Sequence, residues 1–116
     1  MKTVTIGVAS RAEVTERAKA AFRGRKQGAR ISFVSPELMF RTLTSNRWDI
    51  LRRMAGAGPM GVRELARRLD RDVKGVHRDV HALLNAGVID RDDDGRIVFP
   101  FDAIRVEFVV NAIDAA

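Results

Sequence analysis

The 116-residue chain contains no cysteine, so it can form no disulfide, carry no thiolate nucleophile and build no cysteine-based zinc site. No apolar run approaches the ~20 residues that a membrane-spanning helix needs. The N-terminus also lacks the hydrophobic core of a secretory signal. We therefore expect a cytoplasmic protein with no membrane partner.

The chain also lacks the motifs of common enzymes. It has no glycine-rich phosphate loop, no Ser/His/Asp arrangement and no nucleotide-binding fingerprint. Its length suits one compact domain with a modest core, which is short for an enzyme with a buried active site. The sequence thus predicts no catalytic residue and no cofactor.

Metal sites are equally poorly supported. His77 and His81 have the i, i+4 spacing with which metallopeptidase helices hold zinc, but the usual glutamate after the first histidine is absent and the chain has no third histidine. The run 92–94 is three consecutive aspartates, which cannot supply the alternating ligands of a calcium loop. We expect no bound metal ion.

The most informative segment is residues 59–99. Apolar periodicity predicts a short helix over 62–69 and a longer one over 73–85, joined by the turn Asp70-Arg71-Asp72. A β-hairpin follows, with Asp94-Gly95 at its tip, a dipeptide favoured in type I′ turns because both central residues need a positive φ. Helix, turn, helix and hairpin is the order of a winged helix.

Both helices of this segment carry an apolar stripe, formed by Val62, Leu65, Ala66 and Leu69 in the first and by Val73, Val76, Val80, Leu83 and Leu84 in the second. When the stripes pack together, the outer side of the second helix presents Lys74, His77, Arg78 and His81. In helix-turn-helix proteins the N-terminal half of that helix enters the major groove. Arg78 is the best candidate for a bidentate contact to guanine, whereas Lys74 or His77 could contact a base or a phosphate.

We predict nine DNA-binding residues on these elements: Arg63, Arg67, Arg71, Lys74, His77, Arg78, His81, Arg91 and Arg96. The alternative is that the basic outer face is merely solvated. Because the hairpin tip is acidic, only Arg91 and Arg96 at its base could grip phosphate, so we expect this wing to stay back from the duplex.

The run VRELARRLDRDVKGVHRDVHALLNAGVIDRDDDGRIVFP resembles the winged helix-turn-helix of MarR-like and ArsR-like bacterial regulators. The resemblance is stronger to a group of short antitoxin-like regulators with a βαβ segment ahead of the winged helix, and it includes LTSNRWDILRRMAGAG and FPFDAIRVEFVV. This resemblance implies DNA binding and, for an antitoxin, a cognate toxin partner. His77 stands where such regulators commonly have Ser or Thr, which leaves the target sequence open.

The first 34 residues have the pattern of a βαβ extension. Val4, Ile6 and Val8 alternate with polar or small residues, and Ile31 and Phe33 mark a second strand. Ser10 and Glu13 form a capping box at the start of a helix that lies between these two strands. The expected buried face of that helix comprises Val14, Ala18, Ala21 and Phe22. We predict an α+β fold with this extension at 1–34 and the winged helix-turn-helix domain at 35–116.

The segment after residue 34 begins with a helical scaffold and ends with a strand. Ser35-Pro36 is a strong helix start, and Thr44-Ser45-Asn46 offers a second cap for a helix that carries Trp48 as an expected core residue. Alternation over 104–110 predicts a third long strand. We expect the two terminal strands to join one sheet, which is either completed by a second subunit as a dimerisation surface or purely intramolecular.

Charge agrees with a polyanionic partner. The formal net charge is +6, the basic excess lies in the first half, and the segment after Arg91 is acidic. We therefore expect a sequence-specific regulator that binds double-stranded DNA as a homodimeric repressor, and the antitoxin role follows from the resemblance alone. The alternative is a protein-interaction module that keeps the winged helix as a scaffold.

Overall fold

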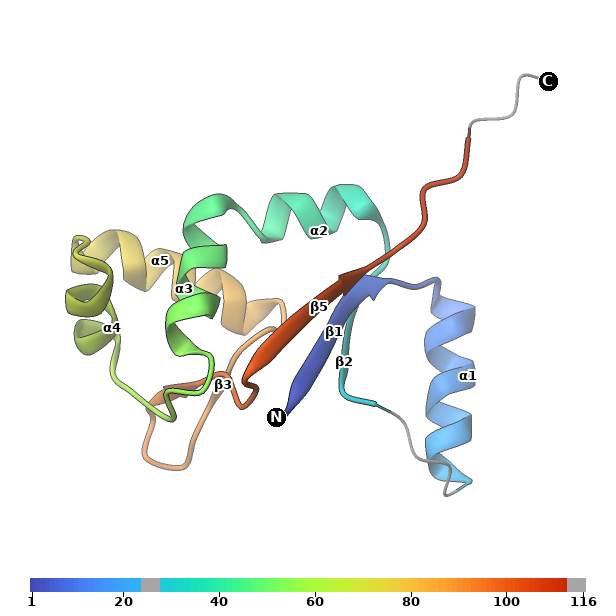
Figure 1. Ribbon diagram of the computed structural model, residues 1–116, viewed down its shortest axis with the longest axis horizontal. Helices are drawn as coiled ribbons and strands as arrows, with labels where there is room; N and C mark the ends of the chain where they lie inside the picture. The colour runs from blue at the N-terminus through green and yellow to red at the C-terminus, as the bar shows by residue number, and fades with distance from the viewer. Residues whose placement is uncertain (24–27, 113–116) are drawn as a thin grey trace.

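A central strand, β1 (Thr3–Val8), organises the sheet in the computed structural model, which describes residues 1–23 and 28–112. Strands β2 (Arg30–Phe33) and β5 (Ala103–Glu107) pair with β1 on either side, both parallel to it, in the order β2-β1-β5 (Figure 1). Val4 and Ile6 are fully buried, as the alternation of β1 predicts. The terminal strands therefore join one sheet within the chain, as predicted.

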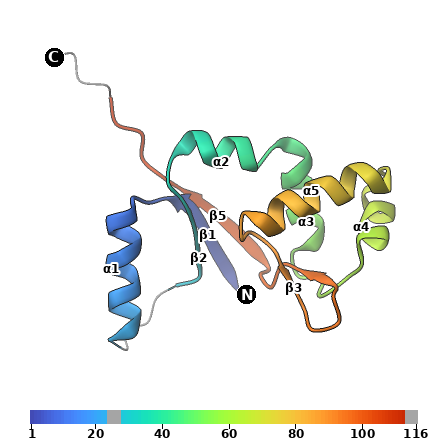
Figure 2. The same cartoon turned by 180° about the vertical axis from the view of Figure 1, so that it is seen from behind.

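The helices that follow β2 in the chain lie together on one side of this sheet (Figures 1 and 2). They are α2 (Pro36–Thr42), α3 (Ser45–Met54), α4 (Val62–Leu69) and α5 (Val73–Asn85), followed by the hairpin strands β3 (Asp90–Arg91) and β4 (Ile97–Val98). The predicted start of α2 is confirmed, because the Ser35 hydroxyl accepts from the Leu38 N–H at 3.1 Å and Pro36 occupies the first turn. Over the described residues the architecture is α+β.

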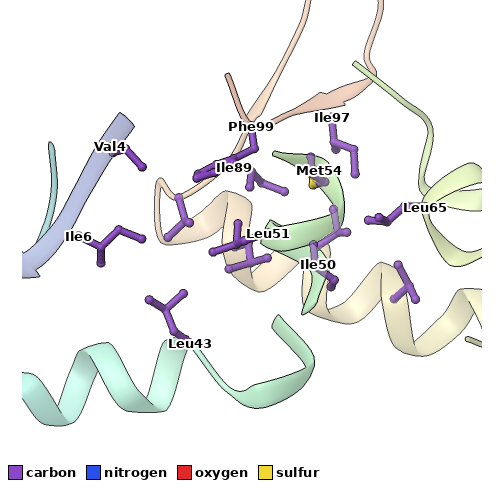
Figure 3. Close-up of a cluster of buried hydrophobic side chains, with 14 of the residues drawn as sticks. Val4, Ile6, Leu43, Ile50, Leu51, Met54, Leu65, Ile89, Ile97 and Phe99 are labelled. Carbon is purple, nitrogen blue, oxygen red and sulfur yellow. The ribbon is translucent and has the colours of Figure 1, made fainter. Parts of the chain in front are cut away.

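One hydrophobic core joins the sheet to the helices. Val4 and Ile6 of β1 face Leu51 of α3 and Phe99 after the hairpin (Figure 3). Residues from before and after the predicted boundary at 34/35 belong to this same cluster. Trp48, expected in the core, is only half buried at its edge. The βαβ segment thus packs directly on the helical part of its own chain.

The helix α1 (Arg11–Phe22) begins as predicted but does not pack as predicted. The Ser10 hydroxyl accepts from the Glu13 N–H at 3.1 Å, yet no residue of α1 is buried and Phe22 is 93% exposed. The expected buried face was wrong because the sheet surface beside α1 carries Arg30 and Ser32. A surface of such residues gives an apolar helix face nothing to bury against.

The hairpin tip also differs from the expectation. Gly95 has φ +81°, but Asp94 does not have a positive φ, which a type I′ turn requires. Instead, the Gly95 N–H donates to the Asp92 carbonyl at 3.0 Å, and the Asp92 carboxylate accepts from the N–H groups of Asp94 and Arg96. The Asp92 side chain stabilises the alternative turn, with Gly95 in the left-handed conformation after it.

The C-terminal strand β5 is shorter than the alternation suggested. It ends at Glu107, so Val109 and Val110 lie beyond it, both exposed.

In the part of the chain that the structure describes, no helix has the length and apolar character needed to cross a membrane.

Candidate nucleic-acid interface

The α4–α5 pair confirms the helix boundaries expected from periodicity. Helix α4 ends where Asp70 adopts the left-handed conformation, with φ 53°, which aspartate tolerates better than most residues. Helix α5 begins three residues later, at Val73, with Asp72 at its N-cap. The short connection fixes the N-terminal half of α5 at the surface beside α4.

The outward face of α5 is basic. Val76, Val80 and Leu83 are fully buried on one side of the helix, which leaves the other side exposed with Lys74, His77, Arg78 and His81. Within residues 1–23 and 28–112, the side chains of Lys74 and Arg78 form no hydrogen bond and no ion pair. These four predicted site residues therefore lie together, and the two long cations are available to a ligand.

Helix α4 contributes Arg63 and Arg67, which are exposed beside the start of α5. The two arginines line a cleft of about 350 Å³, and Val73 is among its other lining residues. Among the described residues, no side chain caps the N-terminus of α5, and the N–H groups of a helix N-terminus attract anions. Asp70 and Asp72 line the same cleft and oppose an anion there, so the open face of α5 is the stronger electropositive surface.

Arg71 differs from the other predicted residues because its guanidinium is engaged inside the protein. Its Nη2 donates to Asp79 Oδ2 at 2.9 Å, and Arg47 Nε donates to the other carboxylate oxygen at 3.1 Å. All three side chains are largely shielded from solvent. A Cβ on Gly75 would lie 3.3 Å from Arg71 Nη2, so the glycine leaves room for this arginine. Arg71 therefore acts here as a positioning residue for α5.

The two hairpin arginines are also held within their own element. Arg91 Nη1 donates to the Gly95 carbonyl at 3.0 Å. Arg96 pairs with Asp94 at 3.1 Å and with Asp92 at 3.7 Å. This exposed hairpin thus neutralises its cations internally.

The two histidines of α5 lie side by side, with ring centroids 4.4 Å apart. In the described part of the chain, no cluster of three or more potential metal ligands is found. The pair can instead donate and accept hydrogen bonds at the exposed face of α5.

Sequence reasoning missed Arg47 and Asp79. Arg47 lies on α3, 32 residues before the carboxylate that it meets, and it also donates to the Thr42 carbonyl at 3.0 Å. A pairing over that separation leaves no periodic trace. The only local sign is that Asp79 interrupts an otherwise basic and apolar helix.

The comparisons with known proteins point to one family. The model of the HVO_A0114 family matches residues 42–106, which is more than half of the chain. The chain belongs to the HVO_A0114 family. The HVO_A0114 match runs from the last residue of α2 into β5, so it includes all nine predicted site residues and omits β1, α1 and β2. Searches of curated proteins and of solved structures returned no match.

Proposed function

We propose that this chain is a sequence-specific DNA-binding regulator with a winged helix-turn-helix. The main support is the exposed basic face of α5, which comes directly after a short turn and lies opposite the fully buried Val76, Val80 and Leu83. A helix presented in this way is what a major groove accepts. The MarR/ArsR-like resemblance of the same segment agrees with this proposal.

The order of elements supports the winged-helix part of the proposal. Helix α3 is followed by Met60, which exchanges two backbone hydrogen bonds of 2.9 Å with Ile97 of the hairpin. Helices α4 and α5 come next, and then the hairpin itself. The Met60 bridge ties the hairpin to the base of the helices, which is the place of a wing.

Within this proposal Arg78 contacts base edges, because its guanidinium is exposed, unpaired among the described residues and one helical turn from Lys74. Lys74, Arg63 and Arg67 contact phosphates, which position the protein without sequence preference. His77 and His81 provide short polar contacts at the same face. Arg71 supports α5 through Asp79.

The wing provides the first prediction. Because Arg91 and Arg96 are bound inside the hairpin, we expect the wing tip to stay away from DNA. Replacing both Asp93 and Asp94 by asparagine should then change DNA affinity by less than about twofold at 0.15 M salt, where charges beyond roughly 8 Å are screened. Fluorescence anisotropy with a labelled duplex measures this. A clear gain in affinity would place the tip against phosphate.

We further propose that the regulator represses transcription and resides in the cytoplasm, where its DNA would be. The resemblance to antitoxin-like regulators extends this proposal to a cognate toxin as protein partner. We assign the chain no catalytic activity. These parts depend on the proposed DNA binding and on the resemblance.

An electrophoretic mobility shift tests the proposal. Purified protein should retard the DNA upstream of its own gene in the presence of excess nonspecific competitor, and a scrambled duplex of equal composition should remain unshifted. Equal retardation of both duplexes, or of neither, would contradict sequence-specific binding.

A protein-interaction role is the second candidate, and the exposed helix α1 favours it. Val14 is 45% exposed and Phe22 93% exposed, although the helix is well capped. If a toxin binds there, co-expression with the product of the adjacent gene should yield a stable complex. Replacing Phe22 by aspartate should abolish co-purification without lowering the melting temperature, because Phe22 buries almost nothing in the chain alone. Co-purification that is unaffected by this change would exclude α1 as the binding surface.

A further inference from the structure

Strand β5 lies at an open edge of the sheet. It pairs with β1 on one side, and among the described residues no strand pairs with its other side. Such an edge presents a row of backbone donors and acceptors that favours pairing with another strand. Figures 1 and 2 show β5 and β2 on opposite sides of β1, with β5 next to the helical part of the protein.

We propose that β5 pairs antiparallel with β5 of a second copy of this chain, about a two-fold axis through Val106. This pairing would give the proposed regulator its dimer surface. Only the contact of both copies with DNA rests on the proposed function. The charge pattern of β5 favours a second copy of this chain as the pairing partner. Arg105 and Glu107 flank Val106 and lie on one face, where they form an ion pair of 3.0 Å within the chain.

Antiparallel pairing about Val106 makes this pattern self-complementary. Arg105 would lie opposite the partner's Glu107, and Glu107 opposite the partner's Arg105. Opposite charges at such cross-strand positions are favourable, whereas like charges are unfavourable. A strand with two such reciprocal pairs fits a copy of itself, as a two-fold interface requires.

Neighbouring registers lose this complementarity. A two-fold centre on Arg105 would place the two copies of that arginine opposite each other, and a centre on Glu107 would do the same for two carboxylates. A shift by one residue would place Arg105 opposite the partner's Val106 and would turn the apolar faces to opposite sides. The register centred on Val106 is therefore specified by both charge and apolar pattern.

An apolar groove lies beside the same edge. It has a volume of about 430 Å³ and is lined by Trp48 and Ala55 of α3 and by Ile104 and Val106 of β5, with Arg52 and Asp102 among the other lining residues. In the proposed pairing the partner's β5 runs along this groove, beside Ile104 and Val106. The pairing thus covers Val106, which is 47% exposed in the single chain.

The proposed pairing has a consequence for the arrangement of the helices. The two-fold axis runs perpendicular to the sheet, so the joined sheet has the strand order β2-β1-β5-β5-β1-β2. Both α3–α5 units then lie on one face of that sheet, and both copies of α1 lie on the other. Two α5 helices on the same side are what a palindromic DNA site requires.

Cysteine crosslinking of the full chain tests the pairing, because the described chain has no cysteine that would compete. In antiparallel pairs, directly opposite Cα atoms are about 4.5–5.5 Å apart, within the range of a disulfide. Oxidised Val106→Cys protein should migrate as a covalent dimer without reductant. Val109→Cys is the matched control: Val109 is more exposed, at 81%, but it would lie roughly six residues, or about 20 Å, from its own copy.

Charge reversal provides a second measurement, made like the first without DNA. Arg105→Glu should weaken the dimer about tenfold, and Arg105→Glu combined with Glu107→Arg should restore it. Equal crosslinking at positions 106 and 109, no rescue by the double variant, or a wild-type monomer at micromolar concentration would overturn the pairing. Since neither assay contains DNA, these outcomes are independent of the mobility shift that tests the proposed function.

Discussion

Replacing Arg78 by alanine should weaken binding to the specific DNA site by about 1–3 kcal/mol and relax the base preference at one position. The guanidinium is exposed on α5 and has no partner within the described residues, so its truncation removes a contact to DNA without breaking one inside the protein. Affinity for unrelated duplexes should fall much less. Titrations of wild type and variant against the specific site and a scrambled duplex measure both effects.

Two variants control for charge alone. Lys74→Ala should weaken binding to all duplexes to a similar extent, because a phosphate contact carries no sequence information. Arg17→Ala removes the same charge from α1, on the far side of the sheet from α5, and should change neither affinity nor preference (Figure 1). If Arg78→Ala leaves the ratio of specific to nonspecific affinity at the wild-type value, Arg78 does not contact bases.

The second large effect concerns the stability of the site. Asp79→Ala should lower the free energy of unfolding by about 2–3 kcal/mol, because it leaves two charged and largely shielded guanidiniums, those of Arg47 and Arg71, without their acceptor. The Asp79 carboxylate is only 13% exposed, so water replaces these bonds poorly. Urea unfolding followed by circular dichroism gives the change.

Asp49→Ala is the matched control for this experiment. Asp49 also faces an arginine, Arg52, but at 3.8 Å and with a side chain that is 58% exposed. Exposed pairs of this kind contribute little, so the loss should stay under about 0.5 kcal/mol. Similar losses for both variants would show that the Asp79 network does not hold α5 in place.

Much of the helical part could be predicted because its determinants are local. The apolar stripes that include Leu65 in α4 and Val80 in α5 set both helix boundaries, and Ser35 and Pro36 set the start of α2. The exposed face of α5 followed from the same periodicity. Local patterns suffice where a helix buries one face and caps its own ends.

The predictions that were wrong or incomplete concern residues whose environment is set by partners elsewhere in the chain. The spacing of Val14 and Phe22 identifies an apolar helix face, but it does not show whether an apolar surface exists to receive it. Arg71 looked available because the carboxylate that it meets, that of Asp79, lies eight residues further along the chain on α5. At the hairpin tip, the side chain of Asp92 outweighed the preference of the Asp94-Gly95 dipeptide.

Strand pairing shows the same limit. Alternation predicted strands at both ends of the chain. In the structure Val4 pairs with Ile104, although these two residues lie near opposite ends of the sequence. Periodicity indicates that a segment is extended and which face is apolar, but not which strand lies next to it. The charges of Arg105 and Glu107 become informative only once β5 is known to lie at an edge.

The central claim, sequence-specific DNA binding through α5, is tested most directly by selection from a pool of random duplexes with the full-length wild-type protein. The account predicts enrichment of one motif containing a guanine whose preference is lost with Arg78→Ala. For a two-fold dimer, the motif should occur as inverted half-sites with centres about 34–36 Å apart. A pool that stays random after repeated rounds, or a motif that Arg78→Ala selects unchanged, would contradict the account.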